Sequence, residues 1–259
     1  MSAAVEPPLR PAASAKAHQE DFSMSDFDRN VAAFPGTAQQ AAIDAGLRAH
    51  MIRVYNYMAG GVALTGVVAY FTNAWFGQAL YGSPLMYVLI FAPLALVFFL
   101  SFRIDKLSTS TATALFFLYA ALVGASLSII FHVYTDASIT RVFFISAAAF
   151  GGLSLWGYTT KRDLSGMGSF LMMGLIGIII ASLVNIFLKS SGLDWIVSVI
   201  GVIVFAGLTA YDTQKIKEMY SAYDDGTVSG RKAIMGALSL YLDFINLFLM
   251  LLRLFGDRR

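Results

Sequence analysis

The chain has 259 residues, of which 58% are hydrophobic and only 13% are charged. A soluble protein has about 45 to 50% apolar and about 25% charged residues, so the composition excludes an ordinary soluble domain and indicates a membrane protein. The formal net charge of +2 is too small to indicate a nucleic-acid surface, and the absence of cysteine excludes a disulfide framework and thiolate metal sites.

The first 45 residues predict a disordered cytoplasmic tail. This segment contains four of the six prolines among many Ala and Ser residues, and it has no sustained apolar period. A basic segment followed by an apolar stretch does not open the chain, so we expect no cleavable signal peptide. The first membrane helix is then expected to direct insertion.

Seven apolar runs follow, separated by polar connectors. A helix needs about 20 residues to cross a hydrocarbon core of about 30 Å, and continuous runs favour helices over the alternating strands of a barrel. We therefore predict an all-α, polytopic integral membrane protein with seven transmembrane helices within residues 46–259. The runs are 54–71, 85–102, 111–131, 142–158, 167–188, 195–211 and 233–254.

Basic residues indicate the orientation of these helices. Alternate connectors carry most of the Lys and Arg residues, and the positive-inside rule places those connectors and the N-terminus in the cytoplasm. The basic connectors contain Arg48, Arg53, Arg103, Lys106, Lys161, Arg162, Lys215, Lys217, Arg231 and Lys232, whereas the other connectors contain Arg141 and Lys189.

The C-terminal tail breaks this pattern, because a seventh crossing would place Arg253, Arg258 and Arg259 outside. A last helix that dips into the membrane and returns would remove the conflict. Charges late in a chain often count for less than early ones, so we favour a full crossing.

Glycine recurs within the apolar runs. Small residues let helix backbones approach closely in lipid, and we expect this packing role for nearly all of these positions. They are Gly60, Gly61, Gly124, Gly151, Gly152, Gly174, Gly177, Gly201 and Gly207.

Two aspartates are the candidate site: Asp243 lies within the seventh apolar run, and Asp212 directly follows the last residue of the sixth. A carboxylate at the centre of a bilayer costs about 2.5 to 3.5 kcal/mol, so each is expected to face protein or water and to have a partner. Less specific roles are also open: Asp212 could pair with Lys215 or be solvated, and Asp243 could be a protonated carboxyl that links two helices.

The last run carries a small and polar stripe that favours a buried helix facing a partner helix. Residues three, four and seven apart share a helix face, which groups Gly236, Ser239, Asp243, Asn246 and Met250. Helical rise places Asp243 about 15 Å into its run and Asp212 about 26 Å along its own. Contact between the two carboxyl groups therefore requires helix tilt or a displaced last helix.

If the two aspartates meet, they cannot easily both ionise, and we expect the pair to retain one proton. The ionised pair would suit a hard cation such as calcium, which takes six to eight oxygen ligands. Asn246 and Thr209 are candidates to support coordination. The connector Asp224-Asp225-Gly226 offers further carboxylates, but a solvated turn is the favoured interpretation.

Two segments carry a family resemblance: residues 211–216, YDTQKI, and residues 237–248, ALSLYLDFINLF. They resemble the signature segments of the Bax inhibitor family (transmembrane Bax inhibitor motif proteins). The likeness extends from about Arg48 to the end of the chain, and the tail and basic connectors look most like bacterial members.

The resemblance implies a seven-helix fold with the last helix central and a pH-sensitive calcium leak channel of the bacterial inner membrane. It implies that Asp212 and Asp243 form the pH-sensing gate, and that an arginine at the end of the second helix acts as a latch. Arg103 is the latch candidate, with Lys106 as the choice if a gap is allowed. Calcium is then expected as the transported ion and not as a cofactor. The protein is expected to contact the lipid bilayer and to have no enzymatic activity.

Two alternatives stay open. One is a non-transporting membrane protein that binds and regulates another membrane protein, such as a protease or a cell-death factor. The other is an intramembrane aspartyl protease, which the sequence disfavours because those enzymes resemble one another in a Gly-x-Gly-Asp segment, whereas Leu240, Tyr241 and Leu242 precede Asp243.

Overall fold

The computed structural model describes residues 35–259, and the chain divides into two units, Met1–Ala42 and Ile43–Arg259. Residues 1–34 of the predicted tail, which is expected to cover residues 1–45, lie outside the described residues. Helix α2 (Pro35–Leu80) begins within that segment, so the predicted boundary at residue 45 falls inside a helix. Proline is favoured at the first position of a helix, because the N–H group that it lacks would have no partner there.

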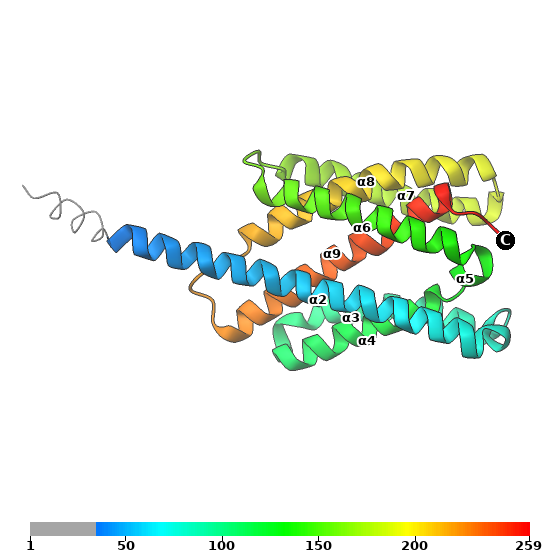
Figure 1. Ribbon diagram of the computed structural model, residues 1–259, viewed down its shortest axis with the longest axis horizontal. Helices are drawn as coiled ribbons and strands as arrows, with labels where there is room; N and C mark the ends of the chain where they lie inside the picture. Colours follow the sequence, from blue (N-terminus) through cyan, green and yellow to red (C-terminus); the bar gives the residue numbers. More distant parts are fainter. Residues whose placement is uncertain (1–34) are drawn as a thin grey trace, which may run out of the picture. The chain divides into compact units, whose positions relative to one another are not determined.

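Among residues 35–259, seven long helices contain the predicted apolar runs, apart from the last four residues of the third run (Figure 1). After α2 come α3 (Pro84–Arg103), α4 (Thr109–Leu127), α6 (Asp136–Thr159), α7 (Ser165–Leu188), α8 (Ser191–Glu218) and α9 (Gly226–Phe255). A 3-10 turn, η1 (Ile104–Lys106), follows α3, and the short helix α5 (Ile130–Val133) follows α4, so the third run is interrupted near its end.

Among the described residues, six helices are long and apolar enough to cross a membrane, namely α3, α4, α6, α7, α8 and α9. The first predicted span belongs to α2, where Asn56 and Thr65 make the run less apolar. The prediction of an all-α, polytopic membrane protein is confirmed. Helices suit this setting because they satisfy every backbone polar group within one segment.

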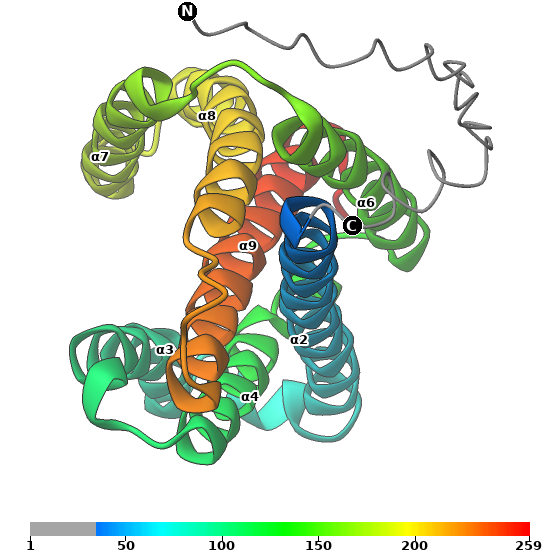
Figure 2. The same cartoon turned by 90° about the vertical axis from the view of Figure 1, so that its left-hand side faces the viewer.

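Helix α9 is the central element, as predicted. In its most apolar stretch 72% of the residues are buried. The corresponding share is 11% for α7, which packs on the outer side of α8. Figure 2 shows α9 in the middle of the helical body with α2, α3, α4, α6 and α8 around it. The fully buried Tyr241 of α9 places its ring edge-on against Phe116 of α4. Its hydroxyl and that of Thr65 in α2 form a 2.7 Å hydrogen bond.

The glycines divide into two groups. An added Cβ at Gly124 of α4 would lie 2.6 Å from the backbone oxygen of Thr65, and close contacts also surround Gly61, Gly174, Gly201 and Gly207. These positions have the expected packing role. Nothing lies within 4 Å of a Cβ built at Gly151, Gly152 or Gly177, so the packing role predicted for these three is wrong.

The two ends of the helical body differ in charge. At the basic end, the α3–α4, α6–α7 and α8–α9 connectors come together: Arg231 donates to the carbonyl oxygen of Asp105, and Lys217 donates to that of Tyr158 at 2.9 Å. At the opposite end, which we call the C-terminal end, the last residues of the chain lie against α6 and α8. The side of the membrane that each end faces stays a prediction.

The C-terminal end neutralises the arginines that broke the predicted charge pattern. Arg259 pairs with Asp136 at 2.7 Å, and Arg253 and Arg258 approach Asp194 at 3.6 and 3.8 Å. Helix α9 is continuous over 30 residues, about 45 Å long, which contradicts the alternative of a last helix that dips in and returns. Acidic residues at the starts of α6 and α8 thus lie beside the arginines of the C-terminal tail and offset their charge.

Candidate functional site

The structure brings the two predicted aspartates together. Asp212 lies near the end of α8 and Asp243 lies within α9; both line one cavity, and their carboxyl groups lie close enough to interact. Helix α9 crosses the body obliquely and packs along α8 (Figure 1). This tilt removes the difference in depth that the residue count predicted, because that count took the two helices as upright and starting from a common level.

Asp243 is the more enclosed member of the pair. The residue is only 5% exposed, and its Oδ2 atom has no hydrogen-bond partner among the described residues. Burying a carboxylate oxygen without a partner is costly, so this atom has a strong preference for a proton or a cation. Asp212 is partly exposed, so the pair has one enclosed and one accessible carboxyl group.

The pair lines a cavity of about 630 Å³ between α7, α8 and α9. Most of its wall is apolar, with α7 contributing residues such as Ile178 and Ile179. Its polar lining residues are the two aspartates together with Ser182, Ser239 and Asn246. A mostly apolar cavity with a few converging polar groups is typical of a binding site.

The two predicted supporting residues have different positions. Asn246 lines the cavity, and its amide nitrogen donates to the carbonyl of Leu242 at 2.8 Å, which leaves the amide oxygen as a group that could bind a cation. Thr209 is fully buried, is not among the lining residues, and donates to the carbonyl of Phe205 at 2.8 Å. Leu208 and Asp212 are one helical turn apart and line the cavity, whereas Thr209 is rotated away from them.

The latch candidate Arg103 does not line the aspartate cavity. It is the last residue of α3, it is exposed, and the cavity is lined by α7, α8 and α9 alone. Within residues 35–259, neither Arg103 nor Lys106 forms a salt bridge. Arg231 of α9 instead makes the contact with the turn that follows α3.

The carboxylates of the α8–α9 connector already have partners. Asp225 caps α9, since its Oδ1 atom accepts from the N–H groups of Thr227 and Val228 at 2.8 and 2.7 Å. Asp224 forms a 2.6 Å salt bridge with Lys232. The described part of the chain contains no group of three or more acidic or histidine side chains that could hold a metal ion. The two aspartates alone supply fewer than the six to eight oxygen ligands that calcium takes.

Two further cavities continue from the aspartate pair toward the C-terminal end. A cavity of about 250 Å³ shares Ser182 and Ile186 with the aspartate cavity and reaches Asp194 and Arg253. These last two residues also line a polar cavity of about 410 Å³ at the C-terminal end. The shared residues show that the three cavities adjoin one another between the C-terminal end and the aspartates.

Comparison with known proteins identifies the family. The sequence profile of the family described as "Inhibitor of apoptosis-promoting Bax1" matches residues 47–259, a range that includes both signature segments. The chain belongs to the Bax inhibitor family.

Bacterial relatives of this Bax inhibitor family protein are similar over most of their length. "Inner membrane protein YbhL" of Escherichia coli K12 is 53% identical over 231 residues, which cover 87% of this chain and 99% of the relative. A protein of Rickettsia prowazekii is 50% identical, covering 86% and 95%, and one of Caulobacter vibrioides is 45% identical, covering 91% and 100%. The chain is therefore an integral membrane protein with close bacterial relatives.

Sequence reasoning missed a buried histidine in this Bax inhibitor family protein. His50 precedes the apolar run of α2, is 4% exposed, and contacts the ring of Tyr220 from the α8–α9 connector. Neither ring nitrogen has a hydrogen-bond partner among the described residues. Burial lowers the pKa of His50, as do the positive charges of Arg53 and Lys232, while Asp224 opposes them. No pattern around His50 distinguished it from a solvated residue.

Proposed function

We propose that this protein is a cation leak channel of the bacterial inner membrane, that calcium is the transported ion, and that Asp212 and Asp243 gate it in response to pH. The observation that carries the proposal is the contact between two carboxyl groups from α8 and α9 within a membrane cavity. The inner membrane is supported by the name of the E. coli relative.

Charge explains how such a pair could act as a gate. Two carboxylates in contact in a low-dielectric site repel each other when both are ionised, and a single shared proton joins them by a hydrogen bond. Loss of that proton either drives α8 and α9 apart or attracts a cation between them. Because the two aspartates lie on different helices, a change of protonation alters the α8–α9 contact.

The cavities support a path for the ion on one side of the pair. The route from the C-terminal end passes Asp194, whose carboxylate lies beside Arg253 and Arg258, and ends at the aspartates. Toward the basic end the two helices pack tightly, since a Cβ at Gly236 of α9 would lie 3.1 Å from the side chain of Ile216 of α8. The path we propose is thus continuous on one side and closed by the α8–α9 contact on the other.

We further propose that the N-terminus is cytoplasmic and that the protein is not an enzyme. The clustering of the basic connectors at one end supports the orientation, through the positive-inside rule. The aspartates serve as ligands and proton acceptors in this scheme, and no step requires a catalytic role.

Calcium influx into liposomes that contain the purified protein tests the proposal, measured from pH 5 to pH 8. We expect wild-type flux to change with pH, and Asp212→Asn and Asp243→Asn each to remove that change, because one amide leaves no shared proton. Asp163→Asn is the control: it removes a fully exposed carboxylate of the α6–α7 connector. Wild-type liposomes that are as tight as empty ones at every pH would exclude the channel and favour a protein that binds another membrane protein.

A further inference from the structure

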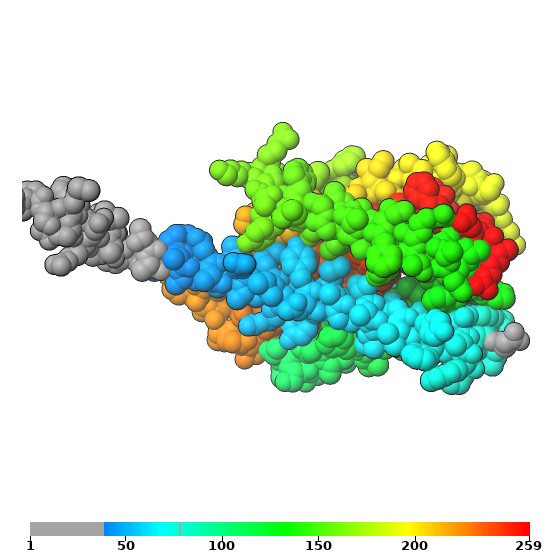
Figure 3. Space-filling model, in the orientation of Figure 1, coloured from blue at the N-terminus to red at the C-terminus, as the bar shows by residue number. Residues whose placement is uncertain are grey.

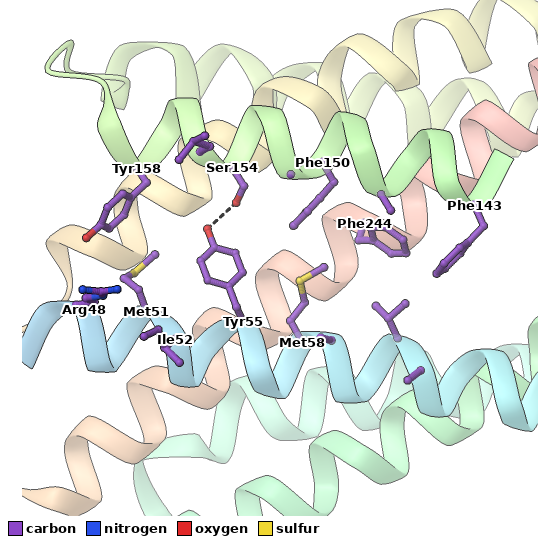
Figure 4. A pocket seen from close by; sticks show the side chains of 16 residues that line it. Arg48, Met51, Ile52, Tyr55, Met58, Phe143, Phe150, Ser154, Tyr158 and Phe244 are labelled. Atoms are coloured by element: carbon purple, nitrogen blue, oxygen red, sulfur yellow. Dashed lines mark hydrogen bonds between the residues drawn. The ribbon is translucent and has the colours of Figure 1, made fainter. Parts of the chain in front are cut away.

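A second, larger cavity lies away from the aspartates, as a groove of about 670 Å³ between α2 and α6. Figure 4 shows its lining side chains, with Phe244 of α9 between α2 and α6. Arg48 and Tyr158 lie together at one end of the groove, and Phe143 lies at the other (Figure 4). The groove follows the border between the blue α2 and the green α6 in Figure 3.

The groove is long and parallel to the helices. Its lining residues run from Arg48 to Ala63 on α2 and from Tyr158 back to Phe143 on α6, so its two ends are fifteen residues apart on each helix. At 1.5 Å per residue this is about 22 Å, of which about 14 Å lies beyond residue 54, where the apolar run begins. One leaflet of a hydrocarbon core about 30 Å thick is about 15 Å deep, so the apolar part of the groove matches the depth of one leaflet.

The inside of the groove offers no unmet polar group. The hydroxyls of Tyr55 and Ser154 hydrogen bond to each other at 2.6 Å, and Ser154 also bonds to Thr213 at 2.9 Å. The other lining side chains along its length are apolar, including Met51, Met58 and Phe150. A cavity with apolar walls stays dry or binds an apolar group, so hydrocarbon is the suitable occupant.

The basic end of the groove adds a charge. Arg48 is exposed, and within the described residues it forms no salt bridge. It lies six residues, about 9 Å, before the apolar run that starts at residue 54, which is the level of lipid headgroups. A guanidinium group binds phosphate oxygens through paired hydrogen bonds, and the Tyr158 hydroxyl beside it is a further donor.

We propose that the α2–α6 groove binds one phospholipid with an anionic headgroup, with an acyl chain along the groove and the phosphate at Arg48. The apolar wall selects the chain, and the guanidinium selects the headgroup. This site is separate from the aspartate cavity and does not depend on the proposed transport.

Native mass spectrometry of the full-length protein, delipidated in detergent, tests this site by titration with dioleoyl phosphatidylglycerol or dioleoyl phosphatidylcholine. We expect one phosphatidylglycerol to bind about fivefold more tightly than phosphatidylcholine, the factor that one basic residue contributes at an anionic lipid surface. Arg48→Gln should remove this preference. Arg53→Gln should retain it, because Arg53 is an exposed arginine of the same helix that does not line the groove.

Two neighbouring glycines provide a matched test of the groove itself. Gly151 lines it and Gly152 does not, and a Cβ at either position meets nothing within 4 Å. Both Gly151→Trp and Gly152→Trp should therefore fold, with equal thermal midpoints. Gly151→Trp should bind both lipids about tenfold more weakly, the loss expected when about two methylene groups are kept out. Gly152→Trp should bind them as the wild type does.

Three outcomes would overturn the proposal. The first is a Gly151→Trp variant that binds lipid as tightly as Gly152→Trp. The second is displacement of the lipid by inorganic phosphate alone, which would assign Arg48 to an anion site without a role for the groove. The third is a protein that carries no lipid and has twice the monomer mass, which would assign the groove to a second copy of the chain.

Discussion

Replacing Gly157 with alanine tests how closely α6 and α8 must approach. A Cβ at Gly157 of α6 would contact the backbone of Ala210 of α8, at 2.9 Å from both its carbonyl carbon and its Cα atom and closer still to its oxygen. Carbon atoms in contact prefer about 3.5 to 4.0 Å, so the helices must separate by roughly 1 Å. A backbone cannot move aside as a flexible side chain can.

The magnitude follows from this clash. Overpacking costs about 1 to 3 kcal/mol, and the better helix propensity of alanine returns roughly 0.5 to 1 kcal/mol. Separation of the helices would also weaken the 2.9 Å hydrogen bond between Ser154 and Thr213, which crosses the same interface. We expect a net loss of about 1 to 2 kcal/mol in the free energy of unfolding.

Thermal unfolding in detergent measures this loss. For a chain of this size, the expected change lowers the unfolding midpoint by roughly 5 °C. Gly151→Ala is the control on the same helix, because its Cβ has open space and the substitution should leave stability unchanged or slightly raised. If Gly157→Ala and Gly151→Ala unfolded at the same temperature, the close approach of α6 and α8 would not contribute to stability, and the reasoning would be wrong.

Three further predictions concern other parts of the molecule. The lowered pKa of His50 favours the neutral ring in the folded protein, so stability should hold above about pH 6.5, the unfolded value, and fall as the pH drops through the lower folded value. Thermal unfolding of His50→Phe should lose this acid dependence, and an unchanged pH profile would assign it to other groups. Tyr241→Phe removes the hydroxyl bonded to Thr65 and should cost about 1 kcal/mol, measured by denaturation, while a loss above about 3 kcal/mol would indicate a wider rearrangement. Arg141→Gln breaks an exposed 2.9 Å salt bridge to Asp257 and should change stability by less than about 1 kcal/mol, with the difference vanishing in high salt.

Much of the fold could be predicted from the order of the residues. Six of the seven apolar runs lie wholly in helices, and the third is interrupted only near its end. A segment in lipid must satisfy its own backbone hydrogen bonds, and run length and continuity are readable without any tertiary contact. The polar stripe of the last run likewise indicated a buried helix, and α9 is the central element. Asp212 and Asp243 were identifiable because carboxylates are costly within apolar sequence.

Tertiary structure decided which of these residues meet. Residue counting placed the two aspartates at different depths, and the oblique packing of α9 along α8 brings their carboxyl groups together. Helix rotation directs Asn246 into the cavity and Thr209 away from it. Gly151 and Gly157 look alike in sequence, yet the first borders an open groove and the second lies against another backbone. Tilt and rotation depend on how neighbouring helices pack, and that information is distributed over contacts between distant parts of the chain.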